Sequence, residues 1–216
     1  MKAAAAEFIV VEGPIGAGKT TLARRLADTL GGEALLEAVE ANPFLPSFYR
    51  DPRGNALAAQ LFFLLSRVQQ LRALRQRDLF RGPCIADFML EKDPLFAELT
   101  LTRDELALYR QLFEHLRVEA PRPDLVIYLQ APVDVLLARI ARRGRPYEQA
   151  VDAAYLQRVN EAYTRFFHHY DEAPLLIVNA AEINFADNED DYRQLLDAIE
   201  RMDGGRRFFN PAPLGR

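Results

Sequence analysis

Residues 13–20 read GPIGAGKT and fit the phosphate-binding pattern G-x-x-x-x-G-K-[ST] at every fixed position. Glycines let a backbone wrap closely around phosphate oxygens and point its N–H groups at them. Lys19 is expected to reach the β- and γ-phosphates of ATP, and the Thr20 hydroxyl to bind Mg²⁺. A glycine turn that precedes a helix by chance is the alternative. The expected ATP-binding residues of the loop are Gly13, Gly16, Ala17, Gly18, Lys19, Thr20 and Thr21.

Carboxylates follow two apolar runs that could be neighbouring strands. In a parallel sheet, ligands bind at the carboxyl ends of the strands. Glu37 could there take a proton from a substrate hydroxyl, with Glu40 as a competing base. Asp87 could hold Mg²⁺, directly or through water. The structural alternatives are exposed carboxylates for the glutamates and a turn or helix-capping residue for Asp87.

Four arginines surround Gly144 in the segment RIARRGRPYEQ: Arg139, Arg142, Arg143 and Arg145. They fall where a helical pattern gives way to a polar loop. Such a cluster suits a lid that closes over phosphates and supplies positive charge during transfer. A solvated basic helix end, favoured by the helix dipole, is the alternative. The phosphate loop elsewhere in the chain favours the lid.

Short apolar runs alternate with longer helical patterns, as in an α/β protein with a mainly parallel sheet. Because the runs lack polar alternation, the sheet should be covered on both faces. The expected strands are Phe8–Val11, Ala34–Ala38, Cys84–Phe88, Leu125–Leu129 and Leu175–Val178. Helices are expected near 18–30, 55–77, 103–118, 133–143, 152–170 and 189–202.

The composition fits one soluble domain. We expect it over residues 1–203, followed by an irregular tail over 204–216, where Gly and Pro are frequent. The net charge of −4 disfavours a dedicated nucleic-acid binder. A single cysteine, Cys84, suits a reducing cytoplasm, and no apolar stretch approaches the ~20 residues of a membrane span. Only three lysines occur, Lys2, Lys19 and Lys92, and lysine differs in chemistry from the far more frequent arginine.

From Glu7 to about Asp203 the chain resembles the deoxyribonucleoside kinase family, particularly its bacterial deoxyadenosine/deoxyguanosine kinase branch. The resemblance is carried by EGPIGAGKTTLA, EAVEANPFLPSFY, QLFFLLSR and RGRPYEQ. It implies a P-loop kinase fold with a five-stranded parallel sheet, surrounding helices and an arginine-rich lid, assembled as a homodimer. It also implies ATP-dependent phosphorylation of the 5′-hydroxyl of a deoxyribonucleoside for nucleotide salvage.

The same resemblance implies roles for individual residues. Glu37 corresponds to the family's general base. Tyr49 and Glu148 correspond to residues that contact the sugar 3′-hydroxyl. Gln60 and Arg67 correspond to residues that read the nucleobase, with Asp93 as the acid paired to the arginine, a set that can bond a base edge bidentately. The lid residues implied are Arg139, Arg143 and Arg145.

The chain departs from the family after Asp87. Many members have Glu-Arg-Ser or Asp-Arg-Ser here, whereas this chain has Asp87-Phe88-Met89. The arginine that would contact phosphate is therefore missing, and Lys92 is a candidate to replace it.

Other functions are also compatible with the sequence. A thymidylate-type kinase would share the loop, lid and fold, but a phosphate acceptor needs cations rather than a base such as Glu37. A GTPase switch would need D-x-x-G after a strand and N-K-x-D, and the nearest matches, DPRG at Asp51 and NEDD at Asn188, fit poorly. A P-loop domain without catalysis is a further alternative. Arg67 with Asp93 favours a purine, although deoxycytidine stays open; the adjacent His168 and His169 are expected to be structural.

Overall fold

The computed structural model describes residues 6–75, 82–116 and 121–211. Its centre is a six-stranded sheet of order β2-β3-β1-β4-β5-β6, in which every neighbouring pair is parallel. The strands are β1 (Phe8–Glu12), β2 (Glu33–Leu35), β3 (Cys84–Ala86), β4 (Leu125–Gln130), β5 (Leu175–Asn179) and β6 (Arg206–Phe209). The α/β class and the parallel sheet are thus confirmed, whereas the strand number is not.

The sixth strand lies in the segment expected to be irregular, so that prediction is wrong for residues 206–209. Gly204 and Gly205 have φ values of 130° and 65°, which let the chain turn back toward the sheet. The Leu175 N–H then donates to the Gly205 carbonyl at 2.8 Å, and β6 pairs with β5 in parallel. The strand was missed because it begins with two arginines and is largely exposed, so it lacks the apolar run that marks a buried strand.

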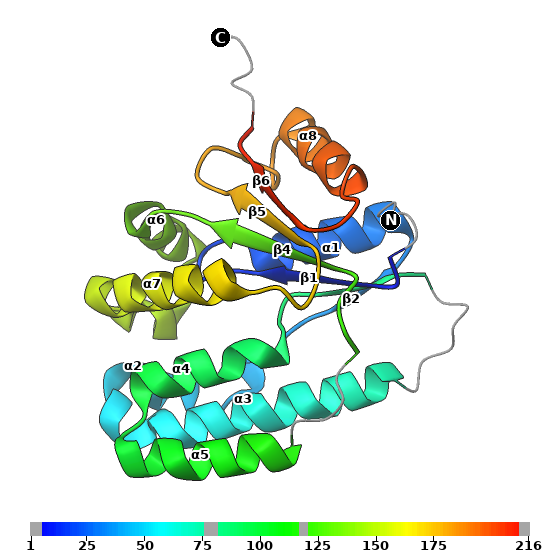
Figure 1. Ribbon diagram of the computed structural model, residues 1–216. Coiled ribbons are helices and arrows are strands. Elements are labelled where there is room, and N and C mark those ends of the chain that lie inside the picture. The colour runs from blue at the N-terminus through cyan, green and yellow to red at the C-terminus, as the bar shows by residue number, and fades with distance from the viewer. Residues whose placement is uncertain (1–5, 76–81, 117–120, 212–216) are drawn as a thin grey trace.

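Helices cover both faces of the sheet (Figure 1). Six lie close to the predicted positions, although the last expected residues of two of them, 76–77 and 117–118, fall outside the described residues. The short α2 and α4 and three 3₁₀ helices were not anticipated. The helices are α1 (Lys19–Leu30), α2 (Leu45–Arg50), α3 (Pro52–Arg75), α4 (Asp93–Thr100), α5 (Arg103–Leu116), α6 (Val133–Arg143), α7 (Ala153–His169) and α8 (Glu189–Glu200), with 3₁₀ turns η2 (Val39–Ala41), η3 (Leu90–Lys92) and η4 (Pro146–Ala150).

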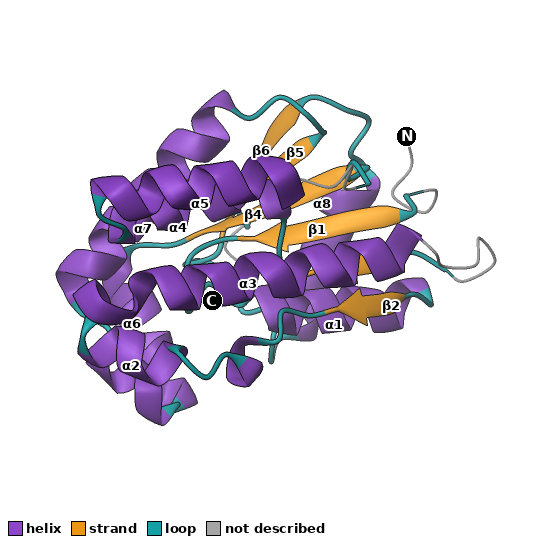
Figure 2. Ribbon diagram, turned by 90° about the horizontal axis from the view of Figure 1, so that it is seen from below, coloured by secondary structure: helices purple, strands orange, loops and turns teal. Residues whose placement is uncertain are grey.

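Alternate side chains of β1 enter two separate cores, because successive residues of a strand point to opposite faces. Ile9 and Val11 pack with α1, α6 and α8. Phe8 and Val10 pack with α3, α4, α5 and α7. Figure 2 shows α3 and α5 across the second of these faces. The expectation of strands buried on both sides is met for β1, β3, β4 and β5, whereas β2 at the sheet edge is only partly buried. Within the described residues, no helix has the length and apolarity that crossing a bilayer requires.

Two strands end earlier than predicted, which affects the site directly. β2 ends at Leu35 and β3 at Ala86, so both Glu37 and Asp87 lie in the connections that follow. The Glu37 N–H donates to Asp87 Oδ1 at 2.7 Å, and the Asp87 N–H donates to the Leu35 carbonyl at 3.2 Å. The Asp87 side chain thus takes the place of a backbone acceptor beyond the ends of β2 and β3. This bond holds Glu37 and Asp87 at the same edge of the sheet.

Candidate active site

The loop of residues 13–20 joins β1 to α1 and can be built only with glycine at key points. Gly16 and Gly18 have φ values of 86° and 101°, which other residues rarely adopt. A Cβ on Gly16 would lie 2.8 Å from the Leu136 carbonyl oxygen, and one on Gly18 would lie 2.9 Å from Cζ of Phe185. The loop is therefore wedged between α6 and the segment around Phe185.

Lys19 opens α1 and folds its side chain back over the loop. Its Nζ donates to the Gly13 carbonyl at 2.8 Å and to the Pro14 carbonyl at 3.3 Å. Burial and the nearby charge of Lys92 lower the Lys19 pKa to about 8, although Glu12, Glu37 and Asp87 act in the opposite direction. An anion over the loop would therefore stabilise the charged ammonium.

Thr20 and Asp87 form the next layer of the site. The Thr20 hydroxyl donates to Asp87 Oδ2 at 2.5 Å. Burial raises the Asp87 pKa, and this hydrogen bond counteracts the rise. A hydroxyl beside a carboxylate is a fitting partial ligand set for Mg²⁺, which usually takes few protein ligands and completes its shell with phosphate and water oxygens. Across the described residues no group of three His, Cys, Asp or Glu could hold a metal.

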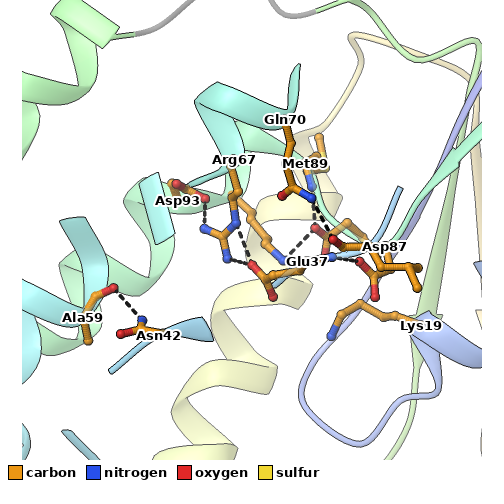
Figure 3. Close-up of polar contacts among 12 residues, drawn as sticks. Lys19, Glu37, Asn42, Ala59, Arg67, Gln70, Asp87, Met89 and Asp93 are labelled. Atoms are coloured by element: carbon orange, nitrogen blue, oxygen red, sulfur yellow. Dashed lines mark hydrogen bonds and ion pairs between the residues drawn. The ribbon is translucent and has the colours of Figure 1, made fainter. Parts of the chain in front are cut away.

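Behind this layer, Arg67 of α3 lies between Glu37 and Asp93 (Figure 3). Its Nε donates to Glu37 Oε1 at 2.7 Å, Nη2 donates to the same oxygen, and Nη1 donates to Asp93 Oδ1. All three side chains are largely buried, so each charge depends on the others.

Burial alone would raise the Glu37 pKa, but the positive charges of Arg67, Lys92 and Lys19 lower it to about 2. Burial raises the Asp93 pKa to about 7 against the pull of Arg67 and Lys92. Arg67 therefore favours the ionised form of Glu37 and opposes the effect of burial on Asp93.

One pocket joins these groups. It is bounded at one end by Lys19, Thr20 and Asp87 and extends past Glu37 to Arg67, Gln60 and Tyr49. Asp93 does not line it and instead supports Arg67 from behind. Gln60 is 6% exposed and donates to the Thr100 hydroxyl at 3.4 Å. The Tyr49 ring stacks on Tyr147 with centroids 6.2 Å apart.

The expected lid arginines divide between two pockets. Arg143 donates to Glu148 from Nε at 2.9 Å and from Nη2 at 2.6 Å, and Arg145 lies 3.1 Å from Glu40 and 3.6 Å from Glu148. Arg139 instead donates to the Ala180 carbonyl at 2.6 Å.

Arg143 and Arg145 line the main pocket. Arg139 and Arg142 line a second pocket, which also takes in Gly16, Gly18 and Thr21 of the loop and Phe185, and which Arg143 borders as well. Glu40, the competing base, is exposed, is paired with Arg145 and lies outside the main pocket, which favours Glu37.

Sequence reasoning missed Glu12, the last residue of β1. It is fully buried and accepts hydrogen bonds from the Gly13 and Met89 N–H groups and the Tyr163 hydroxyl, and Lys92 Nζ lies 2.9 Å from its Oε1. A charged residue that ends an otherwise apolar strand immediately before the loop was the available signal. Phe88, by contrast, is fully buried in the core beneath α3, α4 and α7.

Comparison with known proteins adds independent findings. Residues 9–202 match the family model described as deoxynucleoside kinase. The deoxyguanosine kinase of Bacillus subtilis (strain 168) is 35% identical over 202 residues, which cover 91% of this chain and 98% of that protein. The deoxyadenosine kinase of Lactobacillus acidophilus is 29% identical over 209 residues, covering 90% and 95%. The structure of deoxyadenosine kinase from M. mycoides with bound dATP aligns with a TM-score of 0.78 at 25% identity, covering 89% and 98% of the two chains.

Proposed function

This chain belongs to the deoxynucleoside kinase family and is a phosphotransferase, and we propose that it transfers the γ-phosphoryl group of ATP to the 5′-hydroxyl of deoxyadenosine or deoxyguanosine. The product is the 5′-monophosphate, made for nucleotide salvage. Relatives named deoxyguanosine kinase and deoxyadenosine kinase support a purine acceptor, and the neighbour solved with dATP supports an adenine nucleotide as donor.

The observation that carries this proposal is the single pocket that joins the phosphate loop to a buried carboxylate. Lys19 and Thr20 lie at one end, Arg67 and Gln60 at the other, and Glu37 between them. A donor phosphate on the loop and a nucleoside on the Arg67 side would therefore meet beside Glu37. Proximity and orientation of this kind supply much of the rate in phosphoryl transfer.

In the proposed reaction the 5′-oxygen attacks the γ-phosphorus while Glu37 takes the hydroxyl proton. The new bond joins the 5′-oxygen to phosphorus, and the bond to the β,γ-bridging oxygen breaks with its electron pair leaving on ADP. Arg143 and Arg145 balance the charge that spreads over the transferring oxygens, with Lys19 on the donor side. Mg²⁺, for which Thr20 and Asp87 offer oxygen ligands, would neutralise phosphate charge when bound.

Recognition of the nucleoside is proposed to use the far end of the pocket. Gln60 and Arg67 bond the base edge, with Asp93 orienting the guanidinium. Tyr49 and Glu148 contact the 3′-hydroxyl, and Arg139 contacts ATP from the second pocket. Arg67 also pairs with Glu37, so a base that engages Arg67 would loosen Glu37 and raise its pKa toward a range useful for catalysis.

Three broader features complete the proposal. The kinase domain extends through β6, because this strand belongs to the sheet. Two copies form a homodimer, as the family resemblance suggests, which sedimentation would test. The enzyme works in the cytoplasm and needs neither a nucleic acid nor a membrane.

Transfer of phosphate from labelled ATP to the four deoxyribonucleosides and to thymidylate, measured in parallel, tests the function. We expect transfer to deoxyadenosine or deoxyguanosine and little to thymidylate, because an anionic acceptor beside the ionised Glu37 would be repelled. Transfer to thymidylate alone would identify a monophosphate kinase and remove the role of Glu37 as a base.

A further inference from the structure

Lys92 is an unusual cation because its side chain is 2% exposed and yet lines the main pocket. It ends η3, on the connection from β3 to α4. A buried ammonium is costly unless it is paired. Its Nζ lies 2.9 Å from Oε1 of Glu12, which uses one of its three N–H groups.

Glu12 is suited to hold that ammonium in one place. Its Oε1 also accepts the Met89 N–H at 2.8 Å, and its Oε2 accepts the Gly13 N–H at 3.0 Å and the Tyr163 hydroxyl at 3.1 Å. A carboxylate has about four acceptor sites, so these bonds with Lys92 fill it. Glu12 therefore has no acceptor site left for a substrate. It holds Lys92 next to the start of the phosphate loop, where it also bonds the Gly13 N–H.

Lys92 lies among the groups that would carry out the reaction. It shares the pocket with Lys19, Glu37 and Asp87. Burial and then the charge of Lys92 lower the pKa of Lys19. Burial raises the pKa of Glu37, but Arg67 and then Lys92 lower it. Lys92 therefore acts electrostatically on both the donor-side lysine and the acceptor-side carboxylate.

Transfer places a doubly charged phosphate beside a carboxylate, so the acceptor side also needs a cation. Arg67 lies on this side, but it is paired with Glu37 and Asp93 and is proposed to bond the nucleobase. Arg143 and Arg145 come from the segment expected to be a lid and are paired with Glu148 and Glu40. Lys19 belongs to the phosphate loop, and the apolar Phe88 is packed in the core.

We propose that Lys92, oriented by Glu12, is a catalytic residue that binds the phosphoryl oxygens from the acceptor side during transfer. The inference rests on the proposed function. The proton still passes from the 5′-hydroxyl to Glu37, and ADP still leaves with the electron pair. Lys92 remains an ammonium throughout, and its two N–H groups not used by Glu12 are available to the oxygens of the new 5′-phosphate.

Lys92→Met, Lys92→Arg and a control, Arg110→Met, test the assignment. Arg110 is an exposed cation paired with Glu98 on the surface, so its loss is a matched change of charge away from the pocket. For Lys92→Met we expect kcat to fall by ~10²–10³, as when one preorganised donor is removed, while the KM for the nucleoside changes little. Lys92→Arg should recover part of the loss, and Arg110→Met should behave as wild type.

Binding provides a readout that a structural role would not move. Titration calorimetry of each variant with the nucleoside and with its 5′-monophosphate gives the ratio of the two dissociation constants. We expect Lys92→Met to weaken the monophosphate by roughly tenfold or more relative to the nucleoside, about 1.4 kcal/mol. A kcat or an affinity ratio equal to wild type would overturn the assignment.

If Lys92→Met does not fold because Glu12 is left unpaired, the double variant Glu12→Gln/Lys92→Met removes both charges and allows the same titrations. Wild-type protein that phosphorylates no deoxyribonucleoside would instead refute the proposed function. An active wild type with an unchanged ratio in the Lys92 variant would refute only the role of Lys92.

Discussion

Arg67 donates to Glu37 from Nε at 2.7 Å and again from Nη2, so the proposed base is held by the residue expected to read the nucleobase. The same guanidinium bonds Asp93 through Nη1. In the proposed function, substrate recognition and catalysis therefore share one side chain, and a change in the contact of Arg67 with the base should alter its contact with Glu37.

Glu37→Gln should lower kcat by ~10²–10⁴, the usual contribution of a general base, with nucleoside binding largely retained. An amide can still accept a hydrogen bond from Arg67 but cannot take the proton. Steady-state kinetics with saturating ATP would measure the loss. Glu40→Gln is the matched control, since Glu40 is exposed and lies outside the pocket; a larger loss there than at Glu37 would move the base to Glu40.

Purine analogues that lack an acceptor for Arg67 should lose turnover as well as affinity. Guanine offers O6 and N7 to a bidentate arginine, and 7-deaza-2′-deoxyguanosine lacks N7. With fewer bonds to the base, Arg67 remains hydrogen-bonded to Glu37 and keeps the pKa of Glu37 low. We expect a lower kcat at saturation for the analogue than for deoxyguanosine. Equal kcat values with a higher KM would mean that Arg67 does not couple the two events.

ATP binding should take up a proton at alkaline pH. The Lys19 pKa is lowered to about 8, mainly by burial, so above that pH the free protein has a neutral Lys19. Phosphates favour the ammonium and raise its pKa, so at pH 9 binding should draw up to roughly one proton from the buffer, and less as the pH falls below 8. Calorimetry in buffers of different ionisation enthalpy measures this uptake. Lys19→Arg should abolish it, because a guanidinium stays protonated.

Gly18→Ala should weaken ATP binding by at least about tenfold, because the new methyl group would lie 2.9 Å from Phe185 Cζ in a loop that must keep its shape. Gly31→Ala provides the control. Gly31 also has a positive φ, 63°, but a Cβ there would meet nothing within 4 Å. Gly31→Ala should therefore lower the stability only by the ~1–2 kcal/mol that a left-handed backbone costs a residue with a side chain. Adding Phe185→Ala to Gly18→Ala should restore part of the affinity if the contact is the cause.

Two adjacent phenylalanines of β6 should differ in their contribution to stability. Phe209 packs against the core beside β5, whereas Phe208 is 73% exposed. Phe209→Ala should lower the free energy of unfolding by roughly 1–3 kcal/mol, less than for a fully buried ring. Phe208→Ala should change it by less than about 0.5 kcal/mol. Urea unfolding of both variants would measure the difference, and equal values would mean that β6 does not anchor the sheet.

The loop, the central strands and the longer helices could be predicted because their signals are local: spaced glycines, unbroken apolar runs and three-and-four periodicity. The pairing of Arg67 with Glu37 could not, since it joins α3 to a connection 30 residues away. Glu12 and Lys92 were missed as a pair for the same reason. Residues 206–209 were missed because this edge strand is largely exposed and shows no long apolar run.

The place of β1 in the sheet also constrains how this protein can be made. β1 is the first strand of the chain, but it lies between β3 and β4, and Ile9 pairs with Leu125. The apolar residues of β1 therefore leave the ribosome long before β4, the second strand that pairs with β1, has been synthesised. At about 5–20 residues per second, that wait is on the order of 6 to 25 s during translation. Over that period the nascent chain exposes the FIVV segment, a site at which a chaperone could bind.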